Sequence, residues 1–354
     1  MSIDLSKVTG LSDQYGVITQ LELGGRVIWA AKSGKPIILE VEKITSDTYA
    51  GETTYTGEQF ILLDIYPKTN GTVSVTYGGL TKTITDTSGA AEPNAQQVFF
   101  GTFNGVSDSV ETPASGTLTI EGDCSAFGCG IFQTGSKVTN ITHFSCITAV
   151  SGWGGVTKIP SYAFYECSNL VLTSLPRGLM NIGDYAFVGC PIAISELPNG
   201  ITSIGKSAFM DCTGITVSKL PSCLTKIGDN AFQRCENLSI SEIPDGVETI
   251  GAYAFNMDMD DDGAPLTAMR NVSLPATLVS IGDYAFAFAS QVGVEYKSTV
   301  STVAILATVP PTIEANTFGS AGYGPSIIVP KGFGEAYKAA DGWSNHADKI
   351  VEAS

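Results

Sequence analysis

The nine residues IGDNAFQRC, from Ile227 to Cys235, carry the pattern I-G-x-x-A-F-x-x-C, which the chain uses repeatedly. The full pattern occurs twice more, as IGDYAFVGC at 182–190 and as IGKSAFMDC at 204–212. Shortened or altered copies occupy four further positions: 159–167, 250–255, 281–286 and 313–318. A catalytic motif normally occurs once in a chain, so a motif that recurs seven times predicts architecture rather than chemistry.

The phenylalanine of the motif gives the period of the repeat. It stands at residues 164, 187, 209, 232, 255, 286 and 318, so the spacing is 22 or 23 residues at first and 31 or 32 at the end. Periods of about 20–29 residues are typical of leucine-rich repeats, in which each unit is one coil of a solenoid and buries its apolar side against its neighbours. We therefore expect the seven phenylalanines to form one buried column.

Each coil contains a second recurring sequence pattern between successive phenylalanines, as in NLVLTSLP at 169–176. Its alternating apolar residues predict a short strand that ends in a turn at the proline, followed by a second extended piece that ends in the motif isoleucine. Within the motif, Ile, Ala and Cys have helical spacing, which predicts a short helical turn. The motif glycine is expected to allow a bend, and Asp184, Asp229 and Asp283 stand at N-cap-like positions.

Four of the eight cysteines follow the repeated phenylalanine by three residues: Cys167, Cys190, Cys212 and Cys235. This regular phase favours buried free thiols, because cysteine often serves as a small apolar core residue. A disulfide ladder is the alternative, but a uniform column gives no reason for pairing.

Residues 34–122 lack the repeat and contain six short β-rich runs separated by turn signals, among them GTVSVTYGG and SGTLTIEG. Such spacing predicts an antiparallel β-sandwich of Ig-like size. Residues 1–33 precede it as a leader or docking segment with a hairpin at Gly24–Gly25, and 123–158 is expected to be the junction and N-terminal cap of the solenoid. Repeats fill 159–308, and the last repeat and a C-terminal cap fill 309–354.

The run LPSCLTKIGDNAFQRCENLSISEIPDGVETIGAYAF resembles the BspA-like (treponemal-type) leucine-rich repeat of bacterial and phage proteins. The C-terminal end is similar to the closing unit of that family, with a short amphipathic helix around Ala336–Ala340. The resemblance covers about residues 138–350 and implies a mainly β solenoid that binds other macromolecules and carries no catalytic residues. The leader resembles in style the N-terminal segments of phage and prophage virion accessory proteins of gut bacteria.

The overall charge restricts the partners. Acidic residues outnumber basic ones by 35 to 19, which gives a formal net charge of -16. A nucleic-acid binder needs a basic surface that displaces counterions from phosphate, so no nucleic-acid partner is expected. The sequence MSIDLSKVTGLSDQYG has neither the basic start nor the apolar core of a signal peptide, and no apolar run is long enough to insert into a membrane.

Two groups of residues have metal-ligand chemistry. Asp258, Asp260 and Asp262 before Gly263 match the first half of a calcium loop, but Met269 stands where the bidentate Glu belongs, so the alternative is a solvated acidic loop. Cys124, Cys129, His143 and Cys146 have zinc-ligand side chains at a spacing typical of no common zinc site, which favours structural cysteines. Apart from the candidate Ca²⁺, no cofactor is expected.

Candidate binding residues lie on two columns. A tyrosine stands two residues before the phenylalanine in four repeats, at Tyr162, Tyr185, Tyr253 and Tyr284, and could form either a ligand platform or an apolar cover over each turn. The residues just before each proline, which include Lys219 and Glu242, are small or charged and suit a protein partner.

No enzyme is expected, because the two histidines, His143 and His346, stand in no catalytic motif. The expected function is non-enzymatic binding and display. In the preferred hypothesis the chain is a phage or prophage virion component assembled in the host cytoplasm. Its N-terminal region docks on other virion proteins, and its solenoid binds a bacterial surface protein or glycan. The alternative is a bacterial cell-surface adhesin, which would need export.

Overall fold

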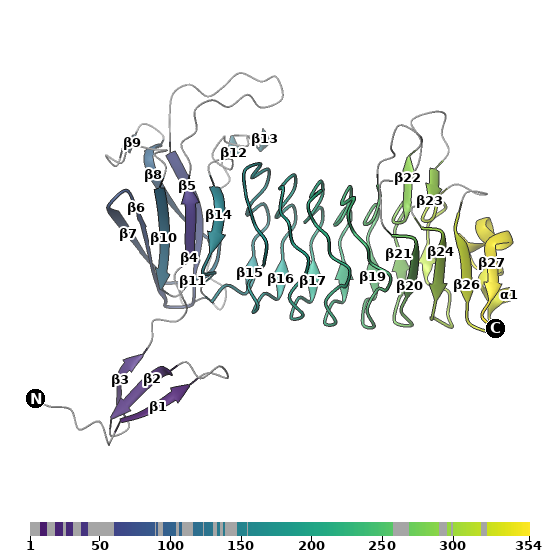
Figure 1. Ribbon diagram of the computed structural model, residues 1–354, viewed down its shortest axis with the longest axis horizontal. Coiled ribbons are helices and arrows are strands. Elements are labelled where there is room, and N and C mark those ends of the chain that lie inside the picture. The colour runs from purple at the N-terminus through teal and green to yellow at the C-terminus, as the bar shows by residue number, and fades with distance from the viewer. Residues whose placement is uncertain are drawn as a thin grey trace, which may run out of the picture.

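The computed structural model shows a mainly β protein whose repeats stand side by side along its length (Figure 1). The residues that it describes are 8–12, 18–23, 26–30, 37–41, 60–88, 90, 95–103, 106–107, 116–122, 124–129, 133–134, 137–138, 147–153, 155–257, 269–289, 296–298, 300–319 and 324–354. The acidic segment with Asp258, Asp260 and Asp262 lies outside these ranges, as do His143 and Cys146.

The first three strands form an antiparallel sheet in the order β1-β2-β3: β1 (Val8–Ser12), β2 (Ile18–Leu23) and β3 (Arg26–Ala30). Leu23 pairs with Arg26, so β2 and β3 pair as neighbours, while the hairpin turn predicted at Gly24–Gly25 lies outside the described residues. Residues 133–138 contribute a separate two-stranded pair, β12 (Gln133–Thr134) and β13 (Lys137–Val138).

Two further antiparallel sheets precede the repeats. One has the order β14-β4-β10-β6-β7: β4 (Ile37–Val41), β6 (Thr72–Tyr77), β7 (Leu80–Thr85), β10 (Gly116–Gly122) and β14 (Ile147–Ser151). The other has the order β11-β5-β8-β9: β5 (Phe60–Pro67), β8 (Gln96–Phe103), β9 (Val106–Ser107) and β11 (Cys124–Cys129). The predicted junction thus supplies β11 and β14 to these sheets. The Ig-like sandwich stays a prediction.

The sheet that contains β11 packs directly on the first repeat. The ring of Phe127 in β11 lies 5.8 Å from that of Phe164 and 5.8 Å from that of Trp153. A β-carbon on Gly128 would come within 2.8 Å of the Ala163 backbone, so this position must stay small. The end of the repeat core is thereby covered with apolar side chains, as a solenoid requires.

Each repeat contributes a two-residue strand to one parallel sheet, in the order β15-β16-β17-β18-β19-β21-β25. These strands are β15 (Lys158–Ile159), β16 (Asn181–Ile182), β17 (Ser203–Ile204), β18 (Lys226–Ile227), β19 (Thr249–Ile250), β21 (Ser280–Ile281) and β25 (Thr312–Ile313). The isoleucine is buried in every strand, which confirms the predicted extended piece ending in Ile.

The strand predicted before each proline is only partly correct. In the early repeats this segment joins its neighbour through single backbone bonds, such as Ala193 N to Leu172 O at 2.8 Å. Among the described residues, longer parallel strands of a second sheet form toward the C-terminal end of the stack: β20 (Asn271–Leu274), β24 (Thr302–Ile305), β26 (Ser326–Val329) and β27 (Ile350–Glu352). A hairpin of β22 (Ala287–Ala289) and β23 (Tyr296–Ser298) lies within the last of the Phe-to-Phe intervals, between Phe286 and Phe318.

The phenylalanine column is confirmed. Successive rings are stacked with centroids 5.3–5.9 Å apart, and every ring is 0–1% exposed. The four column cysteines are buried free thiols. Leucine and isoleucine side chains of the same repeats, such as Ile204 and Leu224, complete a core that runs through the stack.

The short helical turn predicted for the motif is wrong. In the third repeat, the N–H groups of Ala208 and Met210 donate within the turn, to Gly205 O and Ser207 O. The N–H groups that alternate with them donate to the next repeat, as in Phe209 N to Ala231 O at 2.9 Å. Ser207 has a φ of 50°. The segment is a pair of tight turns, because alternate N–H groups turn toward the next coil instead of continuing a helix.

The C-terminal cap is confirmed at the predicted place. Helix α1 (Gly334–Ala339) is followed by two short 3₁₀ turns in Trp343–Lys349. Tyr337 Oη donates to Ala307 O at 2.8 Å, and Trp343 Nε1 donates to Pro311 O at 2.7 Å. The Trp343 ring lies 5.8 Å from Phe318, so it closes the end of the column.

Candidate binding groove

The parallel sheet β15–β25 presents one polar side chain per repeat. In each strand the isoleucine points into the core, and the residue before it points outward because side chains alternate along a strand. These outward positions are occupied by Lys158, Asn181, Ser203, Lys226, Thr249, Ser280 and Thr312. The strands pair in register, so the seven side chains form a straight column along the stack.

In five of the seven repeats a glycine follows the isoleucine, and it is needed for close packing. A β-carbon on Gly183, Gly205, Gly228, Gly251 or Gly282 would come within 2.3–2.6 Å of the preceding repeat's backbone. None of these glycines has a positive φ, so the predicted bend is not the reason for glycine here. The absence of side chains at this row leaves a channel beside the polar column.

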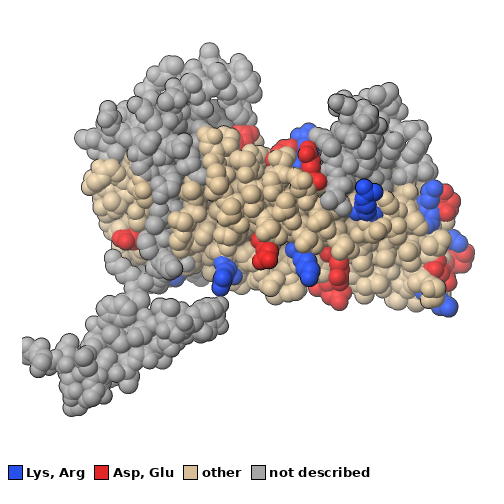
Figure 2. Space-filling view, viewed as in Figure 1, with Lys and Arg blue, Asp and Glu red and all other residues tan. Residues whose placement is uncertain are grey.

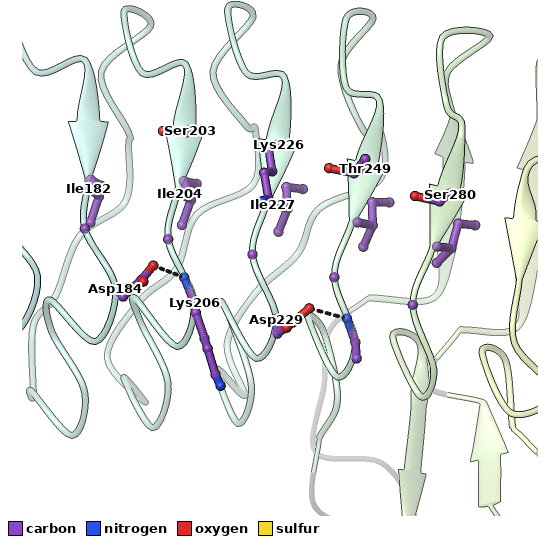
Figure 3. Close-up of a pocket in the computed structure, with 18 of the residues that line it drawn as sticks. Ile182, Asp184, Ser203, Ile204, Lys206, Lys226, Ile227, Asp229, Thr249 and Ser280 are labelled. Carbon is purple, nitrogen blue, oxygen red and sulfur yellow. Dashed lines mark hydrogen bonds between the residues drawn. The ribbon is translucent and has the colours of Figure 1, made fainter.

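This channel is a groove with a volume of about 1070 Å³ that runs across seven repeats. Its lining combines the outward column, the isoleucine and glycine floor, and a row of residues that follows the glycine. Figure 3 shows Ser203, Lys226, Thr249 and Ser280 along the strands, and Asp184, Lys206 and Asp229 along the turns. Among the residues that the structure describes, no aromatic, histidine or cysteine side chain lines this groove.

The aspartates of the turn row bind the next repeat. Asp184 Oδ1 accepts from the backbone N–H of Lys206 at 2.8 Å, and Asp229 Oδ1 accepts from that of Ala252 at 2.9 Å (Figure 3). Asp283 does the same for Asn316 at 3.1 Å. The sequence predicted caps within a single turn, which is wrong: the carboxylate reaches across the stack to a backbone N–H of the following coil.

The predicted tyrosines stand beside the groove but do not line it. They occupy the left-handed turn position, with φ between 56° and 61°. Tyr162 stacks on Tyr185 with ring centroids 4.8 Å apart, and Tyr253 stacks on Tyr284 at 4.9 Å. The structure therefore forms two tyrosine pairs, which are separated by Ser207 and Asn230.

Lys206 links the first tyrosine pair to the groove. Its Nζ atom lies 5.8 Å from the centre of the Tyr185 ring, and its side chain also lines the groove. A hydrogen bond with Tyr185 raises the pKa of Lys206. Partial burial raises the pKa of Tyr162, so Lys206 stays charged and Tyr162 stays neutral at neutral pH.

The other predicted residues are not brought into this groove. Lys219 and Glu242 are exposed on the segment before the proline, and neither lines the channel. Cys124 is buried, its Sγ lies 3.1 Å from Ala126 O, and burial raises its pKa to about 12. Among the described residues no group of three or more His, Cys, Asp and Glu could hold a metal ion. The proposed calcium aspartates lie outside those residues.

Sequence reasoning missed the outward column of the sheet. The signal was present, because a polar residue precedes the motif isoleucine in every repeat. It was overlooked because a single polar residue beside an apolar one does not show which of two extended segments forms the regular sheet.

Comparison with known families agrees with the repeats seen in the structure. Residues 143–259 and 266–306 match the family model of the BspA type leucine rich repeat region, in six copies, while residues 1–142 are not part of that match. A crystal structure of a leucine-rich repeat protein from Bacteroides ovatus ATCC 8483 is similar at 18% identity and a TM-score of 0.29, covering 65% of this chain and 70% of that chain. No curated protein matches the chain.

Leucine-rich repeat proteins are generally non-enzymatic and bind other proteins. No helix in the described ranges is long and apolar enough to cross a membrane. The repeats of residues 143–259 and 266–306 thus match the BspA type, which agrees with the resemblance seen in the sequence for this part of the chain.

Proposed function

We propose that this chain is a non-enzymatic binding protein that uses the β15–β25 face to hold another macromolecule at a bacterial surface. The observation that carries the proposal is the groove of about 1070 Å³, which seven successive repeats line with polar side chains. A small-molecule site is usually a closed, mostly apolar pocket. An open channel that spans the stack, with a polar side chain on every repeat, suits an extended ligand better.

The lining supports binding rather than catalysis. Its titratable side chains are lysines and carboxylates, and each of Asp184, Asp229 and Asp283 has one oxygen held by a backbone N–H of the next repeat. A nucleophile and base in mutual contact are the usual start of a hydrolytic site. The charged side chains of the described lining are instead distributed over six of the seven repeats. Figure 2 shows charged side chains of both signs scattered among uncharged residues on the face toward the viewer.

Two biological settings fit this role. In the first, the chain is a phage or prophage virion component that is docked by residues 1–33 and displays the solenoid to the host. In the second, it is a cell-surface adhesin. The BspA-type repeats support a binding role in either setting. The virion setting is supported by the style of the leader, and detection of the chain in purified particles by mass spectrometry separates it from the adhesin.

The experiment measures binding of the full chain to a panel of intact gut-bacterial cells and to a glycan array. A groove variant with Lys226→Glu and Ser280→Trp is compared with a matched variant outside the groove, Lys219→Glu with Ser241→Trp. Loss of cell or glycan binding only in the groove variant supports the proposal. Equal binding by the parent and the groove variant contradicts it.

The tyrosine pairs form a second candidate contact. Lys206 belongs to both the groove and the Tyr162–Tyr185 pair, so a ligand in the groove could extend onto that edge. Tyr253 and Tyr284 form the corresponding pair farther along the stack. Changing Tyr185 and Tyr253 to Ala tests this edge in the same assay, and unchanged binding would restrict the site to the groove. The Lys219 and Glu242 column is tested by the outside variant.

A further inference from the structure

The basic residues of the groove lie toward one end of the stack, whereas acidic residues occur along its whole length. All three basic residues of the described lining, Lys158, Lys206 and Lys226, belong to the first four repeats. The last three repeats contribute Asp283 and Glu314 and, among their described residues, no basic side chain to the lining. The groove therefore has a mixed but lysine-rich half over β15–β18 and an acidic half over β19–β25.

The side chains that can still form hydrogen bonds or ion pairs with a ligand also differ between the two halves of the groove. Lys158 and Lys226 are exposed and form no ion pair with the described residues. Asn181 accepts from Ser203 through Oδ1 at 2.8 Å, which leaves its Nδ2 group free to donate. In the other half, Asp283 has only Oδ1 engaged, and the Glu314 carboxylate is exposed. The first half thus offers lysine and amide donors beside the second oxygens of Asp184 and Asp229, whereas the other half offers carboxylates and no basic group among its described residues.

The chemistry of the lining favours a polypeptide over a glycan. Sugar rings are commonly held on the faces of aromatic side chains, and the described lining has none. The nearest aromatic rings pair with each other, Tyr162 with Tyr185 and Tyr253 with Tyr284, so each ring has one face covered. The lysine, carboxylate and amide groups of the lining can instead pair with the backbone and the charged side chains of a polypeptide, and such complementary charges give protein complexes their specificity.

The length of the groove sets the length of such a segment. Seven parallel strands give six steps of about 4.8 Å, or roughly 29 Å from β15 to β25. An extended polypeptide covers that distance with about nine residues.

We infer that the groove binds an extended polypeptide segment whose acidic side chains lie over Lys158 and Lys226 and whose basic side chains lie over Asp283 and Glu314. This inference rests on the proposed function and names the ligand class and its orientation in the same site. Complementary charges of this kind contribute more to the choice of partner and of register than to the affinity itself.

The test uses three synthetic peptides of one composition, each of about twelve residues so that the groove is spanned. In two of them acidic and basic residues form separate blocks, in opposite order along the peptide, and in the third the charges alternate. Fluorescence anisotropy with the full chain should show that one block peptide binds about tenfold more tightly than the alternating peptide, with affinity falling as salt increases. Equal affinity for all three would overturn the inference.

Variants of the full chain separate this inference from the proposed function. Lys226→Glu and Glu314→Lys should each weaken binding of the block peptide, whereas Lys331→Glu, at an exposed position outside the groove, should leave it unchanged. If no peptide binds but the groove variant loses binding to bacterial cells, the proposed function stands and the ligand class is wrong. A glycan that binds the parent and not the groove variant leads to the same conclusion. If the groove variants change neither peptide binding nor binding to bacterial cells, both proposals fail.

Discussion

The thiol of Cys212 donates a hydrogen bond to the carbonyl oxygen of Phe187, the core residue of the preceding repeat, at 2.9 Å. Cys190 and Cys235 make the same bond to Phe164 and Phe209, at 2.8 and 3.0 Å. The cysteine column therefore joins neighbouring coils as well as filling space. These three members need no disulfide for this role, because each thiol already has a partner in the adjacent repeat.

The buried cysteines of the column should react with thiol reagents much more slowly than the exposed Cys223. Burial raises the pKa of Cys212 and Cys235, so little reactive thiolate forms there, whereas Cys223 is exposed. Labelling of the native chain with iodoacetamide, followed by peptide mapping, should modify Cys223 quickly and the column cysteines only after unfolding. Disulfide-linked column peptides in freshly purified protein would contradict this account.

Removal of one ring from the phenylalanine column should be costly. Phe209 is fully buried between Phe187 and Phe232, with ring centroids 5.5 and 5.4 Å away. The Phe209→Ala variant should lose about 3–5 kcal/mol of unfolding free energy, because a cavity replaces the ring. Urea denaturation followed by circular dichroism measures this loss. A variant as stable as the parent would show that the column does not hold the stack together.

The glycine row should tolerate no side chain. A β-carbon on Gly228 would come within 2.6 Å of the Gly205 backbone, so Gly228→Ala must push two coils apart at a cost of about 1–3 kcal/mol. Gly178 is the matched control, since nothing would lie within 4 Å of a β-carbon at that position and its φ is not positive. Thermal unfolding should show a lower melting temperature for Gly228→Ala only. Equal melting temperatures would argue against the close approach of the coils.

The sequence allowed the prediction of the repeat period, the phenylalanine and cysteine columns and the C-terminal cap. Each is set by apolar residues at fixed intervals. The roles of Gly228 and Asp229 could not be predicted, because both depend on the distance to a neighbouring coil rather than on their own segment. The groove was missed for the same reason: Lys158 and Lys226 come to share one surface only when β15 to β18 pair in register.

The contribution of the Asp229 hydrogen bond between repeats to the unfolding free energy should be measurable by substitution. Asp229→Ala removes the acceptor for Ala252 N, and the unfolding free energy should fall by about 0.5–2 kcal/mol, the usual range for a lost cap. Asp229→Asn keeps an oxygen at this place and should retain most of the stability. Asp245→Ala changes an exposed aspartate outside the turn row and is the control. If Asp229→Ala and Asp245→Ala have equal effects, the bond contributes nothing.

Lysine footprinting tests the central claim, that the β15–β25 face binds the partner. The full chain is acetylated with an N-hydroxysuccinimide ester while free and while bound to the bacterial cells that retain it, and each lysine is quantified by mass spectrometry. Lys158 and Lys226 line the groove, whereas Lys219 and Lys331 are exposed outside it. We predict that binding protects Lys158 and Lys226 and leaves Lys219 and Lys331 as reactive as before. Protection of Lys219 with unchanged reactivity at Lys158 and Lys226 would contradict the account.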